Sequence, residues 1–302
     1  MAARVKSTAR GGPESVAAVR DLLLVHIDAV SSRLELGQAM TTIDVHEARK
    51  SIKRARAVLK LLRPSLAATG AARSKRALRD AGRALAAARD AKVIADRFDE
   101  VLRRAGIARS AVRSLAKNLP PASAALPSDP VLALTGLAAA RKRLARASLP
   151  ATNWTPLGAG IRSIYKSGRQ LVPGRADTVS VEAMHEWRKQ VKSYWHALEI
   201  FAPVRPTQIR RTIGSARRLA DSLGEEHDLA LLADHLRDAA TENQGEPVTE
   251  LLDAIEQRRW RLRRRAIKIG AALYAETPAV MEKLLRRHWQ QWRTGRALVL
   301  ST

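Results

Sequence analysis

The chain has 302 residues, with 54 Lys and Arg against 29 Asp and Glu, so its formal net charge is +25. Such a chain repels itself unless an anionic partner neutralises it, which favours nucleic acid, an anionic membrane or a phosphate polymer. It contains no cysteine, which excludes disulfide bonds and thiolate metal sites and suits a reducing cytosol. Aromatic residues are only 4%, and Ala, Leu and Arg favour helix, so the composition predicts an all-α protein.

The predicted elements are helical almost throughout. Residues 1–12 end in Arg-Gly-Gly and are expected to form a flexible tail; no apolar signal segment follows them, and no run approaches bilayer length. Thr42 and Asp44 are candidate N-caps of the second helix, and Gly82 is the weak point of the third. In chain order, helices are predicted at Glu14–Leu36, Val45–Arg63, Arg73–Arg104, Ile107–Asn118, Val131–Ser148, Leu157–Leu171, Val179–Phe201, Pro206–Leu223, Glu226–Ala240, Pro247–Ala275 and Pro278–Arg293.

The chain matches itself at a fixed offset. The segment from Val45 to Lys53 aligns without a gap to Met184 to Lys192, 139 residues later, and Asp90–Asp96 aligns to Asp228–Asp234 at an offset of 138. The stretch from Leu119 to Pro130 carries four prolines and is the best linker candidate. We therefore predict two copies of one helical unit, 13–149 and 150–302, arranged as two bundles related by an approximate two-fold axis.

Each copy carries a cationic stripe. Positions i, i+3, i+4 and i+7 share one helix face, so His46, Arg49, Lys50 and Lys53 form a stripe that Arg56 and Lys60 extend. A solvated basic face is the simpler interpretation. The same residue types nevertheless recur in the second copy, as His185, Arg188, Lys189 and Lys192, and a solvated face does not require a histidine at its start.

These two segments and their tandem layout resemble the CHAD domain, the conserved histidine α-helical domain. Supporting pieces are Ile161–Arg169 and Leu223–Asp228. The resemblance implies a basic groove between the bundles, binding of inorganic polyphosphate and association with polyphosphate granules in the cytoplasm. It implies ligand contacts from His46, Arg49, Lys53, Arg54, Arg56, Arg162, Lys166, Arg169, His185, Arg188, Lys189 and Lys192. The chain departs from the family at Trp195 and His196, where members often carry Arg and Tyr.

Further basic residues either line the predicted groove or face solvent. The candidates are Arg20, His26, Arg76, Arg79, Arg83, Arg210, Arg211, Arg217 and Arg218. By contrast, Arg258, Arg259, Arg261 and Arg263–Arg265 surround their helix and are interpreted mainly as solvated. Trp289 and Trp292 are expected to pack against helices.

Signatures of catalysis are missing. There is neither a phosphate-binding glycine loop nor a serine nucleophile elbow, and Lys50 and Lys189 occupy the place of the second His of a zincin motif. We therefore expect no catalytic residue, metal or cofactor. Asp90, Asp96, Asp228 and Asp234 are expected to cap helices or pair with Arg, although a two-metal site is the alternative.

The sequence thus favours a non-catalytic protein that binds polyphosphate. A general nucleic-acid-binding protein remains open on charge alone, and a metal-dependent phosphohydrolase is the third hypothesis.

Overall fold

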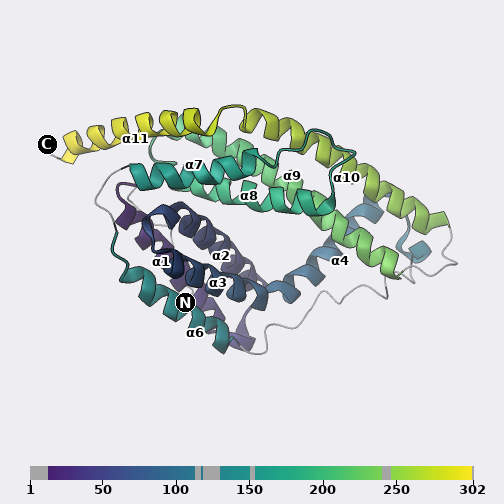
Figure 1. Ribbon diagram of the computed structural model, residues 1–302. Helices are drawn as coiled ribbons and strands as arrows, with labels where there is room; N and C mark the ends of the chain where they lie inside the picture. The colour runs from purple at the N-terminus through teal and green to yellow at the C-terminus, as the bar shows by residue number, and fades with distance from the viewer. Residues whose placement is uncertain (1–12, 113–116, 118–129, 150–153, 240–245, 301–302) are drawn as a thin grey trace.

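The computed structural model describes residues 13–112, 117, 130–149, 154–239 and 246–300, and all regular structure within them is helical, as predicted (Figure 1). The α-helices are α1 (Val16–Leu34), α2 (Thr42–Leu62), α3 (Ala68–Ala84), α4 (Ala86–Ala105), α6 (Val131–Ala145), α7 (Thr155–Arg169), α8 (Val181–Ile200), α9 (Pro206–Ala239), α10 (Glu246–Leu273) and α11 (Pro278–Leu300). Short 3-10 turns lie at Gly37–Ala39, Arg63–Ser65 and Arg109–Val112.

The start of α2 differs from the prediction. Its N-cap is Thr41, whose side chain accepts a hydrogen bond from the Asp44 amide, while the Asp44 carboxylate accepts one from the Thr41 amide. Both donors belong to the first turn, whose amides lack partners within the helix. Asp44 is therefore the third helical residue of a capping box, and neither Thr42 nor Asp44 is the cap itself.

Four predicted helices have different bounds. The helix expected at Arg73–Arg104 is interrupted at Leu85, not at Gly82, and becomes α3 and α4. The two expected on either side of Gly224 form one continuous helix, α9, so Asp228 does not follow a helix start. Of the helix expected at Ile107–Asn118, the described residues show only the turn at Arg109–Val112, after Gly106 caps α4 with a φ of +73°.

The starts of several helices follow the same offset as the sequence match. Helix α7 begins at Thr155, 139 residues after α1 at Val16, and α8 begins at Val181, 139 residues after α2 at Thr42. The start of α9 at Pro206 lies 138 residues after that of α3. Helix α9 therefore stands where the first copy has α3 and α4.

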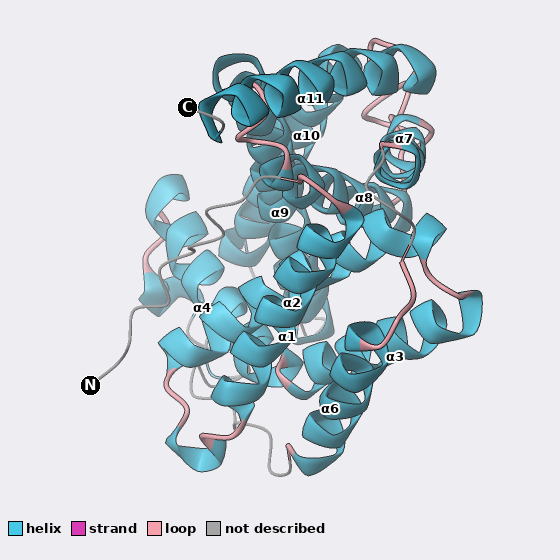
Figure 2. Ribbon diagram, turned by 90° about the vertical axis from the view of Figure 1, so that its left-hand side faces the viewer, coloured by secondary structure: helices cyan, strands magenta, loops and turns pink. Residues whose placement is uncertain are grey.

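The helices form two groups joined by α4. Figure 1 shows α1, α2, α3 and α6 on one side and α7 to α11 on the other, while α4 leaves the first group and reaches α9 and α10. In the view turned by 90° (Figure 2), α1 and α2 lie below α8 and α9, and α2 packs directly against α8. The helices that carry the two motif copies are therefore neighbours.

Two hydrophobic cores hold this arrangement, and both copies contribute to each. The larger joins α1, α2 and α3 to α7, α8 and the first part of α9. The smaller places Ile94 and Phe98 of α4 against Leu232 of α9 and Ile255 of α10. Trp289 of α11 is buried, as expected, and its indole N–H donates to the carbonyl of Pro13 at 2.7 Å. The proposed boundary at 149/150 and the proline-rich linker lie at or within segments outside the described residues and stay predictions.

Candidate functional site

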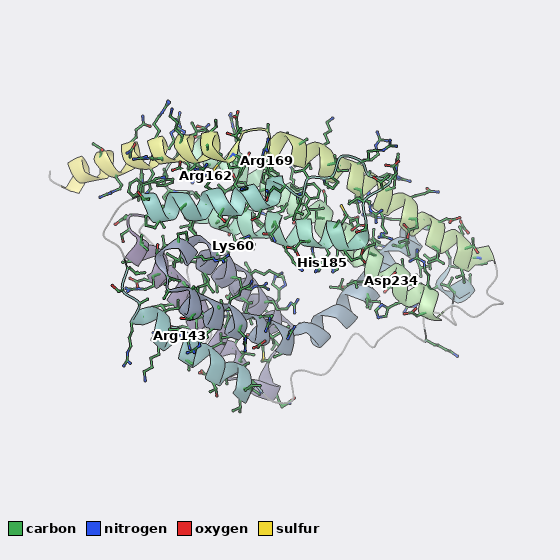
Figure 3. All side chains as sticks on the ribbon, viewed as in Figure 1. Lys60, Arg143, Arg162, Arg169, His185 and Asp234 are labelled. Carbon is green, nitrogen blue, oxygen red and sulfur yellow. The ribbon has the colours of Figure 1, made fainter. Side chains whose placement is uncertain are left out.

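The two motif helices contact each other through polar side chains. Nζ of Lys60 on α2 donates to Oε1 of Gln190 on α8 at 2.5 Å, and the amide of Gln190 donates to Glu186. Glu186 also accepts from Nζ of Lys189 at 3.0 Å. Figure 3 shows Lys60 between the ribbons of α2 and α8. A cation of the first copy and a cation of the second copy are thus linked through one amide and one carboxylate.

Lys60 lies among other cations. Burial lowers the pKa of Lys60 to about 8. The Glu186 carboxylate opposes this shift, whereas the positive charges of Lys75 and Arg63 add to it. Desolvation and repulsion both disfavour a charged ammonium, so Lys60 loses its proton far more easily than an exposed lysine.

Arg56 is in the same situation. Burial and the nearby charge of Arg79 on α3 lower the pKa of Arg56. We call the five residues of α2, the following turn and α3 the cation cluster: Arg56, Lys60, Arg63, Lys75 and Arg79. Of the carboxylates around it, Asp80 accepts from Arg79 at 3.4 Å, and Glu186 is the one that acts on Lys60.

The histidine of the second motif contacts another histidine. Nδ1 of His185 lies 3.3 Å from Nδ1 of His227 on α9, with the ring centroids 4.5 Å apart. Burial lowers the pKa of His185, and the charges of Lys189 and Arg188 lower it further. Figure 3 places His185 on the side of α8 that faces α4. Two imidazoles, which donate or accept according to protonation, therefore stand beside the cations of α8.

Arg188 belongs to a junction of three helices. Its Nη2 lies 4.0 Å from a carboxylate oxygen of Asp228 on α9, and the other oxygen lies 3.8 Å from Nη2 of Arg97 on α4. The Asp228 side chain therefore sits between two guanidinium groups, as expected for a carboxylate that pairs with Arg. Because α4 supplies Arg97, the first copy contributes a cation next to the motif of the second copy. No sequence pattern indicated this contribution.

In the first motif, Arg49 is anchored to the backbone. Its Nη1 donates to the carbonyl of Leu85 at 2.9 Å, at the break between α3 and α4. Lys50 pairs with Glu47 at 3.3 Å, as Lys189 pairs with Glu186 in the second copy. His46 is exposed, and Lys53 is half-buried. The stripe thus forms on one helix, and Arg49 and Lys50 within it also have partners.

His26 and Arg54 lie in a polar group between α1, α2 and α8. Nδ1 of His196 lies 3.0 Å from Glu199, and Nε of Arg54 lies 3.7 Å from the same carboxylate. Burial lowers the pKa of His26 to about 4, helped by the charges of Arg54 and His196. His26 is therefore neutral at pH 7. The contact between Arg54 and Glu199 joins α2 to α8, and His196 shares the same carboxylate.

The predicted contacts on α7 are differently placed. Arg162 and Lys166 are exposed, whereas Nε of Arg169 donates to the carbonyl of Tyr274 at 3.1 Å, at the end of α10. Figure 3 shows Arg162 and Arg169 on α7, toward α11 and α10. Arg169 therefore satisfies a carbonyl at the end of a helix.

The additional candidates divide between paired and exposed residues. Arg20 pairs with Asp21 at 2.8 Å, Arg83 with Asp80 at 4.0 Å and Arg217 with Asp221 at 3.8 Å. Arg218 donates to Ser215 at 2.9 Å. Those that are simply exposed are Arg76, Arg210 and Arg211. Of these additional candidates, Arg79 alone belongs to the cation cluster.

The interpretation of the α10 arginines as mainly solvated is wrong for three of them. Arg259 is only 4% exposed and its guanidinium lies 3.2 Å from Glu226, which is itself 1% exposed. Arg263 reaches the same carboxylate at 2.9 Å, and Arg258 pairs with Glu225 at 2.7 Å. Burying a carboxylate is costly unless cations pair with it, so these arginines hold α10 on α9.

The described residues lack both a metal-binding cluster and a membrane-spanning helix. They contain no group of three or more His, Asp or Glu side chains that could hold a metal ion. No helix of this part of the chain combines the length and apolarity that crossing a bilayer requires. The side chain of Asp90, one member of the alternative carboxylate set, lies outside the described residues.

Comparison with known proteins gives a family and a fold. The solved structure of PptA from Streptomyces chartreusis matches with a TM-score of 0.56 at 15% identity, over 92% of this chain and 99% of that chain. At this identity the likeness shows the fold alone. The chain has no match among the curated proteins. The family model described as the CHAD domain matches residues 23–237, well over half of the chain, so this protein belongs to the CHAD domain family.

Proposed function

We propose that the protein binds inorganic polyphosphate through the cations that α2, α3 and α8 bring together. In this proposal the two copies are related by an approximate two-fold axis, and the polymer lies in a basic groove between them. The ligand contacts are those that the family resemblance implies on α2 and α8, joined by Lys60, Arg63 and Lys75 of the cation cluster.

The crowding of like charges carries the proposal. Lys60 has a pKa of about 8 and that of Arg56 is lowered, in both cases through burial and neighbouring cations. A fold that holds cations together destabilises itself unless an anion is present. A bound polyphosphate would offset this repulsion and raise the pKa of Lys60 again, so part of the binding free energy comes from relieving the repulsion between the cations.

The residue types suit a polymer of phosphates. Arginine offers two parallel donors to phosphate oxygens, and lysine offers a compact charge. Many such contacts act together on one chain, so affinity should increase with polymer length and decrease steeply with salt.

Nucleic acid is the weaker alternative at this site. Among the aromatic residues of α8 near its cationic positions, Trp187 and Tyr194 are buried at 0% and 2% exposure, so neither can stack on a base. Trp195 is half-buried, and its ring already stacks on His196. Polyphosphate has no bases, so its binding does not require an exposed aromatic side chain. Polyphosphate should therefore displace duplex DNA at equal phosphate concentration, and DNA should not displace polyphosphate.

We also propose that binding is not coupled to catalysis. Asp228, which a two-metal site would require as a ligand, lies between Arg188 and Arg97. Phosphate release from polyphosphate with Mg²⁺ or Mn²⁺ would support a phosphohydrolase instead. A binding module of this kind fits a scaffold or targeting role at polyphosphate granules in the cytoplasm.

Charge reversal on both motif helices tests the site. Arg49 and Arg188 have contacts to other helices that position them, so a cleaner pair is Arg56→Glu with Lys189→Glu. Both side chains reach solvent, and the Glu186 partner of Lys189 lies on the same helix. Losing two charge-assisted contacts, each worth about 1.5 kcal/mol, should weaken polyphosphate binding by about a hundredfold in a fluorescence titration. The matched control is Arg265→Glu with Arg286→Glu, which makes the same charge change at exposed positions of α10 and α11. An equal loss of polyphosphate affinity in the two variants would show that binding depends on overall charge and not on this site.

A further inference from the structure

Two adjoining hollows lie between α10 and the segment that joins α7 to α8. Figure 1 shows this segment running beside α10. Their volumes are about 600 and 400 Å³, within the range of small-molecule sites. Trp260 of α10 and Asp177 of the opposite segment line both hollows. None of the residues in the proposed polyphosphate site lines either one.

Trp260 differs from the other tryptophans. All six lie in the described residues, and Trp260 is the exposed one, at 46%, while the others are buried or half-buried. The guanidinium of Arg264 lies over its ring, 4.6 Å from the centroid. This cation–π contact restrains the indole, so it presents a fixed aromatic surface between the two hollows.

The walls combine cations with two carboxylates, Asp177 in both hollows and Glu256 in the larger one. Lys268 and Arg264 line one hollow and Arg261 the other, and Glu256 beside Arg261 already pairs with Arg237 and Arg259 at 2.7 Å each. Asp177 is held by Arg175 at 2.7 Å, and this hydrogen bond lowers the pKa of Asp177. The site therefore offers an aromatic face, phosphate-binding cations and an ionised carboxylate that accepts hydrogen bonds.

We propose that these hollows form a binding site for a nucleoside triphosphate, separate from the polyphosphate site. The base stacks on Trp260, the phosphates contact Lys268 and the arginines of α10, and Asp177 accepts from a ribose hydroxyl or base amino group. Stacking on an exposed aromatic ring contributes about 1–3 kcal/mol, which a ring-less phosphate chain does not gain. The Asp177 carboxylate repels such a chain. The α10 residues also lie beyond the family match at 23–237, so the inference does not depend on the proposed function.

Isothermal titration of the full chain with ATP tests this, with tripolyphosphate as the ligand that lacks the base and ribose. Trp260→Ala should weaken ATP binding by about tenfold or more, from the loss of stacking, while Trp260→Phe keeps a ring and most of the affinity. Binding of tripolyphosphate should be the same in all three proteins. The variant Arg56→Glu with Lys189→Glu should lose polyphosphate and keep ATP.

Three results would overturn the site. Wild-type ATP affinity in Trp260→Ala would remove the stacking role. Loss of ATP binding in the charge-reversed variant would mean that ATP is bound as a short polyphosphate on α2 and α8. If a single-stranded oligonucleotide bound more tightly than ATP, and this binding depended on Trp260, the ligand of the site would be a nucleic acid and not a mononucleotide. Polyphosphate is titrated in parallel with the same proteins. A failure of polyphosphate binding is therefore seen independently of a failure of ATP binding.

Discussion

At the scale of single residues, Lys60 links protonation to ligand binding. Its folded-state pKa is lowered from 10.5 to about 8, so its charge destabilises the protein below pH 8, and this penalty disappears as the pH rises toward 10.5. A bound polyanion stabilises the charged form and raises the pKa again. Binding should therefore take up protons near pH 8.5, and affinity should fall as the pH rises through 8.

Calorimetric titrations of the protein with polyphosphate, in buffers of different ionisation enthalpy, measure this proton uptake. Lys60→Arg is the control, because arginine keeps its charge across this range. Wild-type protein should take up more protons at pH 8.5 than Lys60→Arg. Equal uptake would show that polyphosphate does not reach Lys60.

The buried carboxylate of Glu226 makes a second residue-scale prediction. It holds Arg259 and Arg263 inside the protein, and removing it leaves their charges without this partner. Glu226→Ala should lower the free energy of unfolding by about 3–5 kcal/mol, measured by urea denaturation. Adding Arg259→Met should recover part of the loss, since it also removes a buried charge. A double variant no more stable than Glu226→Ala would contradict this explanation.

At the scale of elements, a glycine sets how closely α7 approaches α2. A Cβ at Gly160 would lie 2.0 Å from the carbonyl oxygen of Leu61, and backbone cannot move aside easily. Gly160→Ala should therefore destabilise the protein by about 1–3 kcal/mol, as overpacking does. Gly82→Ala on α3 is the matched control, because its Cβ would meet Ile52 at an ordinary 3.7 Å. There the better helix propensity of alanine should leave stability equal or higher, and urea denaturation of both variants separates the effects.

The differences between predicted and observed helices have long-range causes. The break falls at Leu85, whose carbonyl accepts from Arg49, 36 residues earlier, and no local pattern contains that contact. Helix α9 continues through Gly224 because Leu223, Glu226 and Asp228 around it are all buried. Tertiary packing there outweighs the roughly 1 kcal/mol that glycine costs in a helix.

At the scale of the whole molecule, the cationic stripes could be predicted from the sequence, whereas the contacts that other helices make with them could not. Helical spacing and the repeat indicated the His-led faces of α2 and α8, because both are local properties. It could not show that α4 carries Arg97 to Asp228, or that Lys60 reaches Gln190, because both contacts depend on how the copies pack. The same holds for Arg259, whose buried partner lies 33 residues earlier on another helix.

Lysine footprinting with a long polyphosphate tests the central claim most directly. Acylation of the full chain, read residue by residue by mass spectrometry, reports which ammonium groups the polymer covers. Lys60, Lys75 and Lys192 should lose reactivity when polyphosphate is added, whereas the exposed Lys142 of α6 and Lys283 of α11 should keep it. Uniform protection of all lysines, or protection of the two controls alone, would contradict a polyphosphate site between α2, α3 and α8.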